Sequence, residues 1–452
     1  MQTDGHASGA AEGPLAAAAR AGDMLRVKQL LEEREGRPHG GSDDETAAFA
    51  AAVQALHTDV ADLLIRRGAV PGEVAPDRLP SLREAVGFGS PALVDALTGG
   101  SIRHRYPTSE LKELRDLART WHEAGTEAEL RRRTGSSGDV AYTRVQDDEG
   151  YYKVGELTLE GVTVRDGHGA ILTELEELLG IRTSCDDLVT RALERDPDHT
   201  AWGRAAIMLS HRREPEAWAV AETLRADADP RRRLFGAELT RLFELFADAH
   251  EEQYCVLAVA ALTDWSAEET DPAVLATVLH GLSSYQGPRA EAALLAHLGH
   301  HDPGVRRAVA AGLGTSKDGE HLSGRAREGV LTLMNDPDTD VGIAACRSAG
   351  DIANGDPVLS DSLAALLDHP ERRVRLEAVQ SLALHRDERC VEAAKRLGPP
   401  RPGYREEELY CLEAAWRFER RRGDTARTTR PGMRSNVASI APEGTAPWPR
   451  DT

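Results

Sequence analysis

An aspartate-proline pair that recurs at a nearly fixed interval limits what this chain can fold into. Six prolines mark the pairs: Pro197, Pro230, Pro272, Pro303, Pro337 and Pro370. The sequence separations between successive prolines are nearly equal, except for a longer one from Pro230 to Pro272. Aspartate directly precedes the first five, and Asp368 precedes the sixth by two positions. An interval of this length is typical of repeat proteins, whose repeats stack and share one continuous core.

Each pair has the chemistry of a helix start. An aspartate at the N-cap accepts hydrogen bonds from first-turn amides, and a proline that follows loses no bond, because its missing N–H would have no partner there. Small or apolar residues then recur every four positions, as at Val305, Val309 and Leu313. We therefore predict an all-α chain, an α-solenoid, with seven helix pairs from 183 to 420. The last pair, 387–397 and 406–420, is expected to cap the stack.

A second repeat is present near the N-terminus. Val27, Val60 and Leu93 are equally spaced along the sequence, and Leu31, Leu64 and Leu97 follow the same spacing. Residues 14–100, which begin with Pro14-Leu15 and Ala18, resemble ankyrin repeats. The resemblance implies pairs of short helices that alternate with projecting turns.

The segment between the two arrays, 101–182, is less regular. A helix is expected from Thr108 or Ser109 to about Arg133, and alternating apolar residues predict a small β-hairpin near 140–165. Asp166 is expected to cap a further helix that ends at Gly180. The polar leader, 1–13, and the basic tail, 421–452, lack any period and are predicted to be disordered.

The second array carries a nameable pattern. Asp-Pro-x-Val-Arg-x-x-Ala at 302–309, and Val374-Arg375 with Ala378, resemble HEAT repeats of the short, phycobilin-lyase-like type. The resemblance implies a right-handed solenoid whose second helices line a concave face, where a protein partner would bind. The candidate contacts on that face are four arginines: Arg306, Arg307, Arg373 and Arg375.

Composition narrows the class of partner and the location. The formal net charge of −20 disfavours phosphate backbones and anionic membranes, and aromatic residues at 4% argue against a large aromatic pocket. Fifty arginines against five lysines suggest a GC-rich bacterial genome. The five cysteines form no C-x-x-C pair, and no apolar run is long enough to span a bilayer. We expect a cytoplasmic protein with buried, reduced thiols.

Sequence features that could carry chemistry are few. His297, His300 and His301 have a spacing that can bind a metal, but histidines at a helix C-terminus also interact favourably with the helix dipole, and we favour that interpretation. The turn from Asp166 to Gly169 resembles an active-site turn and is equally well explained as a helix cap. Motifs of hydrolases, nucleotide-binding loops and dinucleotide-binding folds are absent. We therefore predict no catalytic residue, no metal and no cofactor.

Three functions from different classes remain. The leading hypothesis is a non-catalytic scaffold that binds a protein partner on the concave face of the solenoid. The second is a HEAT-type enzyme or metal-binding protein. The third is a weak nucleic-acid binder that acts through the arginine-rich tail.

Overall fold

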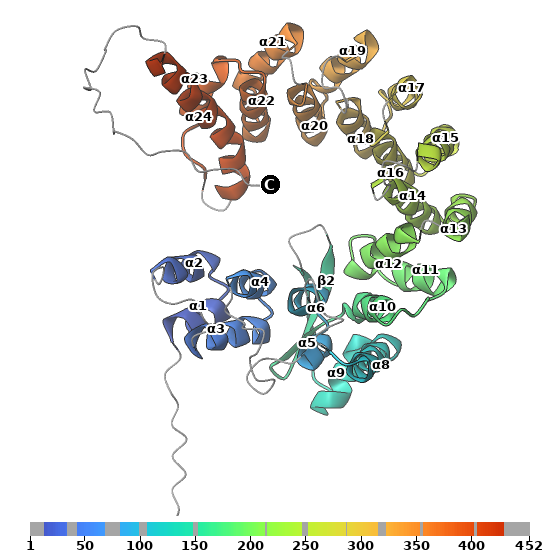
Figure 1. Cartoon of the computed structure of the whole chain (residues 1–452). Helices are drawn as coiled ribbons and strands as arrows, with labels where there is room; N and C mark the ends of the chain where they lie inside the picture. Colours follow the sequence, from blue (N-terminus) through green and yellow to red (C-terminus); the bar gives the residue numbers. More distant parts are fainter. Residues whose placement is uncertain are drawn as a thin grey trace, which may run out of the picture. The chain divides into compact units, whose positions relative to one another are not determined.

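The computed structural model of the chain consists of short helices arranged in pairs, with one small sheet in the described part (Figure 1). The described residues are 13–33, 43–67, 82–98, 106–147, 152–212, 215–245, 252–285, 287–314, 322–352, 356–401 and 405–428. They fall into two compact units, Met1–Val309 (unit 1) and Ala310–Thr452 (unit 2). Residues 1–12 of the predicted leader and 429–452 of the predicted tail lie outside the described residues.

Three helix pairs open unit 1. They are α1 (Pro14–Arg20) with α2 (Met24–Glu32), α3 (Asp43–Gln54) with α4 (Thr58–Arg66), and α5 (Leu82–Phe88) with α6 (Pro91–Thr98). Val27, Val60 and Leu93 occupy the second helix of each pair and are fully buried. Their equal spacing in the sequence thus marks equivalent core positions, and it predicted all three pairs.

The connector contains two helices where one was predicted. These are α8 (Thr108–Ala124) and α9 (Thr126–Thr134), which are separated by Gly125 at a φ of 84°. A left-handed backbone of this kind interrupts a helix, and glycine adopts it without steric cost. Trp121, predicted to lie on the apolar face of this helix, is fully buried.

A three-stranded antiparallel sheet replaces the predicted hairpin. Its strands are β1 (Ala141–Gln146), β2 (Lys153–Leu159) and β3 (Val162–Arg165), in the order β1-β2-β3. The third strand follows a two-residue turn, Glu160-Gly161, in which both residues have positive φ. Such turns match the natural twist of paired strands and make tight hairpins.

Helix α10 (His168–Leu178) lies at the centre of unit 1. Nine of its eleven residues are buried, because it packs against α6, α8 and α12. Its N-cap is Gly167, and no side chain caps it. The prediction that Asp166 caps this helix is therefore wrong. The Asp166 carboxylate instead accepts hydrogen bonds from Gly155, Arg195 and His199.

The second array consists of seven helix pairs in the described part of the chain. They are α11 (Cys185–Leu193) with α12 (Thr200–His211), α13 (Pro215–Arg225) with α14 (Pro230–Leu245), α15 (Glu252–Glu268) with α16 (Pro272–Ser283), α17 (Pro288–Ala296) with α18 (Pro303–Leu313), α19 (Gly324–Leu333) with α20 (Thr339–Gly350), α21 (Pro357–Ala365) and the short 3₁₀ helix η1 (Leu366–Asp368) with α22 (Arg372–Leu384), and α23 (Arg389–Leu397) with α24 (Arg405–Thr428). The architecture is the predicted all-α solenoid.

Within each unit, the second helices of successive pairs lie side by side, and we call each such row the second-helix layer of that unit. In unit 1 this layer contains α12, α14 and α16, and in unit 2 it contains α20, α22 and α24. Each layer helix packs on its pair mate and on its layer neighbours, which buries one side of the helix. None of the helices among the described residues is both long and apolar enough to cross a bilayer.

The Asp-Pro pair begins three of the second helices as predicted. Asp229, Asp271 and Asp302 each accept a hydrogen bond from a first-turn amide of α14, α16 and α18. The other three helices begin two or three residues after the proline, and a residue nearer the helix caps them. These caps are His199, Asp338 and Glu371.

The last helix is longer than predicted. Helix α24 continues to Thr428, whereas we expected it to end at Arg420 and the tail to begin at 421. Arg422 forms an ion pair of 2.8 Å with Glu388 and so attaches this end of α24 next to α23. The break in apolar periodicity at this point does not end the helix.

Candidate functional site

Arg306 closes the turn that leads into α18. Its Nη1 donates to the backbone oxygens of His300 and His301, at 2.8 and 3.0 Å. The same arrangement binds two other arginines to carbonyls five and six residues earlier: Arg233 to Ala228 and Asp227, and Arg375 to Pro370 and His369. Two of the four predicted partner contacts, Arg306 and Arg375, thus hold their own turns.

The other two predicted arginines extend from second helices, Arg307 from α18 and Arg373 from α22. Arg373 on α22 forms an ion pair of 2.8 Å with Asp340 on α20, and both side chains are at least half exposed. Arg307 is exposed and forms no ion pair within the described residues. Arg306 and Arg307 belong to unit 1, whereas Arg373 and Arg375 belong to unit 2. The four predicted arginines are therefore divided equally between the two units.

A second ion pair crosses the layer of unit 2 and was missed by the sequence reasoning. Arg347 Nη2 on α20 lies 2.9 Å from Glu377 Oε2 on α22, and the Glu377 side chain is only 5% exposed. Burial, reinforced by the Glu377 charge, raises the pKa of the neighbouring Cys411 thiol to about 12. The separation of 30 residues between Arg347 and Glu377, close to the repeat period, is the signal that could have identified this pair.

The three histidines after α17 lie in the turn between two helices. The His300 ring centroid is 6.3 Å from that of His297 and 4.3 Å from that of His301. His300 Nδ1 accepts the amide hydrogen of Asp302, which occupies one of its two ring nitrogens. Among the described residues, no group of three His, Cys, Asp or Glu side chains is placed to hold a metal ion.

The Asp166 carboxylate is the centre of a buried hydrogen-bond network. Its Oδ1 accepts from Gly155 N at 2.6 Å and from His199 Nε2 at 2.9 Å, and its Oδ2 accepts from Arg195 at 2.7 Å. Burial alone would raise the pKa of Asp166, but His199 and Arg195 bring it below its usual value. His199 Nδ1 accepts from Ala201 N, so Nε2 carries the ring proton. These contacts fix the sheet to the start of α12.

His168 is part of an aromatic stack. Its ring lies parallel to that of Trp121, with centroids 4.6 Å apart and an angle of 4° between the planes. The Arg133 guanidinium lies 4.3 Å from the Trp121 ring centroid. Burial lowers the pKa of His168 to about 3, so the ring is neutral and packs as an aromatic group. The turn from Asp166 to Gly169 therefore has a structural role that accounts for its residues.

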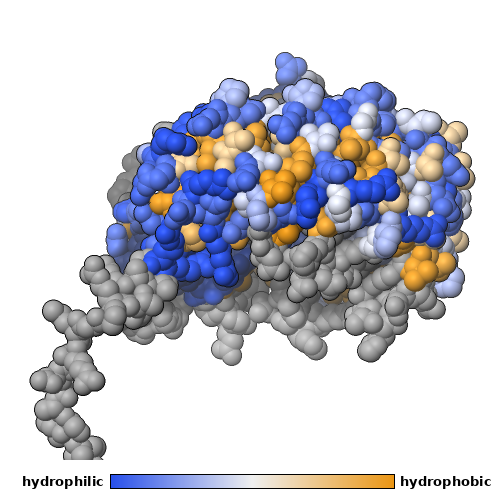
Figure 2. All heavy atoms as spheres, turned by 90° about the horizontal axis from the view of Figure 1, so that it is seen from above, coloured by the Kyte–Doolittle hydropathy of each residue, from blue (hydrophilic) through white to orange (hydrophobic). Residues whose placement is uncertain are grey.

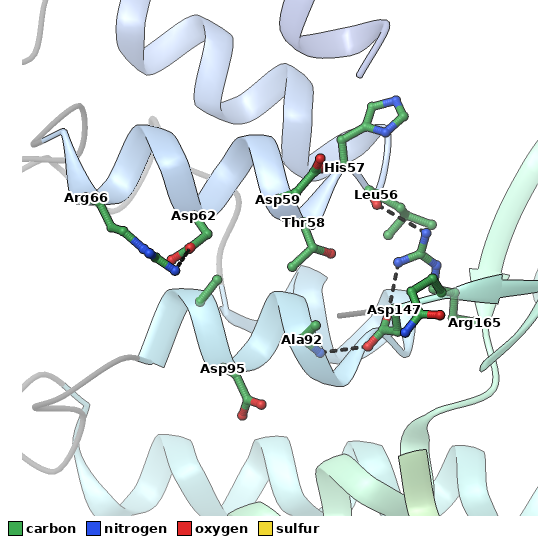
Figure 3. A pocket seen from close by; sticks show the side chains of 12 residues that line it. Leu56, His57, Thr58, Asp59, Asp62, Arg66, Ala92, Asp95, Asp147 and Arg165 are labelled. Carbon is green, nitrogen blue, oxygen red and sulfur yellow. Dashed lines mark hydrogen bonds and ion pairs between the residues drawn. The ribbon is translucent and has the colours of Figure 1, made fainter. Parts of the chain in front are cut away.

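A cleft of about 600 Å³ opens in unit 1 between α4, α6 and the sheet (Figure 3). Its walls come from the α3–α4 turn, one side of α4, one side of α6 and the ends of β1 and β3. The lining residues are Leu56, His57, Thr58, Asp59, Asp62, Arg66, Ala92, Asp95, Ala96, Gln146, Asp147 and Arg165.

A buried ion pair closes one end of the cleft. Arg165 Nη1 donates to Asp147 Oδ1 at 2.9 Å, and Arg165 Nη2 donates to Leu56 O at 3.1 Å (Figure 3). Asp147 also accepts from Ser90 Oγ at 2.6 Å and from Ala92 N at 2.8 Å, and so caps α6 from outside the helix. Burial raises the pKa of Asp147, and Arg165 opposes this effect. This end of the cleft is rigid.

Comparison with known proteins identifies one part of the array. Residues 259–324 match the family model of HEAT repeats, and no curated protein matches the chain. Among solved structures, the chain is similar to the X-ray structure of YibA from Escherichia coli, at 17% identity and a TM-score of 0.37, over 53% of this chain and 93% of YibA. The segment that matches the HEAT family model, 259–324, contains α16, α17 and α18. The Asp-Pro-x-Val-Arg pattern lies at the start of α18. This part of the α-solenoid is therefore similar to HEAT repeats.

Proposed function

We propose that the chain is a non-catalytic scaffold that binds a protein partner on its second-helix layer. HEAT repeats are commonly protein-interaction scaffolds, and the match covers part of this layer. The observation that carries the proposal is a set of two ion pairs between α20 and α22, Asp340–Arg373 and Arg347–Glu377, in which all side chains except that of Glu377 are exposed.

These charges stand on a rigid platform. Val341 on α20 and Val374 and Ala378 on α22 are almost completely buried, so the backbone beneath the charged groups has little freedom. A partner that pairs with preorganised charges loses less conformational entropy than one that must order them. Figure 2 shows a face of the molecule on which apolar residues lie in small groups among hydrophilic ones. The exposed layer side chains named above are charged, so we expect a polar interface.

We assign different roles to the four arginines. Arg307 and Arg373 are exposed and are the proposed partner contacts, whereas Arg306 and Arg375 hold the turns that position them. A stable interface of this kind buries about 1,600 Å² in total, which requires several layer helices. The interface therefore extends beyond these residues.

We extend the proposal to the repeat type of the N-terminal helix pairs and of the second array. We infer that they are ankyrin-like repeats, supported by the equal sequence spacing of the buried Val27, Val60 and Leu93. We also infer that the second array is of the short HEAT type, supported by the pattern at 302–309.

The proposal is tested by affinity capture with the full-length chain from a lysate of its source organism, followed by mass spectrometry. We expect a specific partner that is lost with Arg373→Glu. The matched control is Arg325→Glu, which makes the same charge change at an exposed position on α19, outside the layer. Equal capture by wild type and both variants would exclude the layer of unit 2 as the binding face.

A further inference from the structure

We propose that the cleft between α4 and α6 binds an arginine side chain from an extended segment of a partner protein. This surface is separate from the second-helix layer. The inference therefore stands whether or not that layer binds a partner.

The cleft has an excess of negative charge. Its lining contains four aspartates and two arginines, which leaves two negative charges in excess when His57 is neutral. The Asp147–Arg165 pair is buried and neutralises itself. Asp95 pairs with Arg204, which lies outside the lining, at 2.6 Å. Asp59 forms no ion pair among the described residues, so a cationic ligand gains an unpaired carboxylate nearby.

Asp62 on α4 already binds a guanidinium at the mouth of the cleft. Its partner is Arg66, one helical turn later, whose side chain is 70% exposed (Figure 3). A pair at this spacing whose arginine is largely exposed contributes little stability, so an incoming arginine can compete with Arg66 for the Asp62 carboxylate. The Asp62 carboxylate is 31% exposed and therefore open to a ligand from the cleft.

The rest of the lining suits the other parts of an arginine residue. Ala92 and Ala96 present small apolar surfaces on which the methylene groups can lie. Thr58 Oγ1 is buried and has no hydrogen-bond partner within the described residues, so it can accept a guanidinium hydrogen. A volume of about 600 Å³ exceeds one side chain and leaves room for the adjoining backbone. Arginine suits this site better than lysine because its planar donors can reach a carboxylate and a hydroxyl at once.

The test measures binding of a carboxyfluorescein-labelled Gly-Ser-Arg-Ser-Gly peptide to the full-length chain by fluorescence anisotropy at low salt. We expect Asp62→Asn to weaken binding about tenfold and Arg66→Ala to strengthen it about threefold, because Arg66 competes for the same carboxylate. Ala96→Leu, which narrows the cleft without changing its charge, should also weaken binding. Replacement of the arginine by citrulline, which has a similar shape but no charge, should abolish it.

The matched controls come from another exposed pair at the same spacing, Glu413 and Arg417 on α24. Glu413→Gln and Arg417→Ala change the net charge equally and should alter affinity less than about twofold. Circular dichroism of each variant checks that it is folded. The proposal is overturned if Asp62→Asn behaves like Glu413→Gln, if Arg66→Ala fails to strengthen binding more than Arg417→Ala, or if the citrulline peptide binds equally well. These peptide-binding results do not depend on the outcome of the capture experiment, because Arg373 lies outside the cleft.

Discussion

Arg165 and Asp147 form a buried ion pair, 2.9 Å between Nη1 and Oδ1, in which the aspartate side chain is completely inaccessible to solvent. The same guanidinium donates to Leu56 O, and the same carboxylate binds Ser90 and Ala92 N. One ion pair therefore connects the sheet, the α3–α4 turn and the start of α6. The N-terminal helix pairs are fixed to the rest of unit 1 partly through this contact.

Replacing Arg165 with methionine should strongly destabilise unit 1. The substitution keeps much of the side-chain volume but leaves Asp147 buried without its charge partner, and loss of one member of such a pair costs about 3 kcal/mol. The measurement is the free energy of urea unfolding, followed by tryptophan fluorescence. Arg144→Met, which removes the exposed pair with Asp198, is the control and should cost less than about 1 kcal/mol. Similar losses for both variants would contradict the proposed role of burial.

Acid should destabilise unit 2 through Glu408. Hydrogen bonds from Arg372, joined by those from Arg401 and opposed by burial, lower the pKa of Glu408 to about 2. A carboxylate whose pKa is lowered by folding stabilises the folded state above its unfolded pKa of about 4.5. That contribution disappears as the pH falls from there to about 2. It amounts to roughly 3 kcal/mol at neutral pH.

The check is the urea midpoint between pH 7 and pH 2 for wild type and Glu408→Gln. The variant should be less stable at pH 7 and should lose less stability on acidification. Glu413→Gln on the same helix removes an exposed carboxylate and should leave the wild-type pH profile in place. If the urea midpoint of Glu408→Gln varied with pH as that of the wild type does, protonation of Glu408 would not be the cause of the acid destabilisation.

Gly350 should not tolerate a methyl group. A Cβ at this position would lie 2.7 Å from Ser381 Oγ and 2.8 Å from Ser381 Cβ, because Ser381 donates a hydrogen bond to Cys346 O from the neighbouring layer helix. Ser348 makes the same bond to Ala310 O and closely approaches Gly314. These contacts set the distance from α20 to α22 and from α20 to the end of α18.

We expect Gly350→Ala to cost about 1 to 3 kcal/mol of stability, the usual range for overpacking. Gly324→Ala is the control, since a Cβ there meets no atom within 4 Å and alanine favours helix. Thermal unfolding of the two variants compares them directly. Equal stability of Gly350→Ala and Gly324→Ala would mean that α20 and α22 can move apart without a loss of stability, which would contradict the prediction.

The sequence predicted the repeat architecture because it rests on local signals. A fixed period, N-caps and an apolar residue at every fourth position are visible within one repeat, and they located the helix pairs and the buried Val27, Val60 and Leu93. The third strand and the break at Gly125 were missed. Both depend on positive φ at residues that the apolar pattern does not report.

The site residues were harder to predict because their partners are far away in sequence. Asp166 precedes a glycine turn and has the pattern of a helix cap, but its partner His199 comes from the start of α12. The Asp147–Arg165 pair likewise depends on how the sheet packs against α6, whose flanking Ser90 binds Asp147. No local sequence pattern specifies such packing. The apolar spacing within one repeat predicts a helix but does not predict which distant side chains that helix contacts.

The adjacent residues Arg306 and Arg307 should respond differently to the same substitution. Successive residues of a helix point about 100° apart, so Arg306 faces the preceding turn while Arg307 extends into solvent. Arg306→Lys loses a planar donor group that binds two carbonyls and should reduce stability by about 1 kcal/mol. Arg307→Lys keeps the charge at an exposed position and should be neutral within about 0.5 kcal/mol. Urea unfolding of both variants tests this difference. Equal stabilities would mean that the Arg306 bonds do not hold the turn, and Arg306 would then be as available to a partner as Arg307.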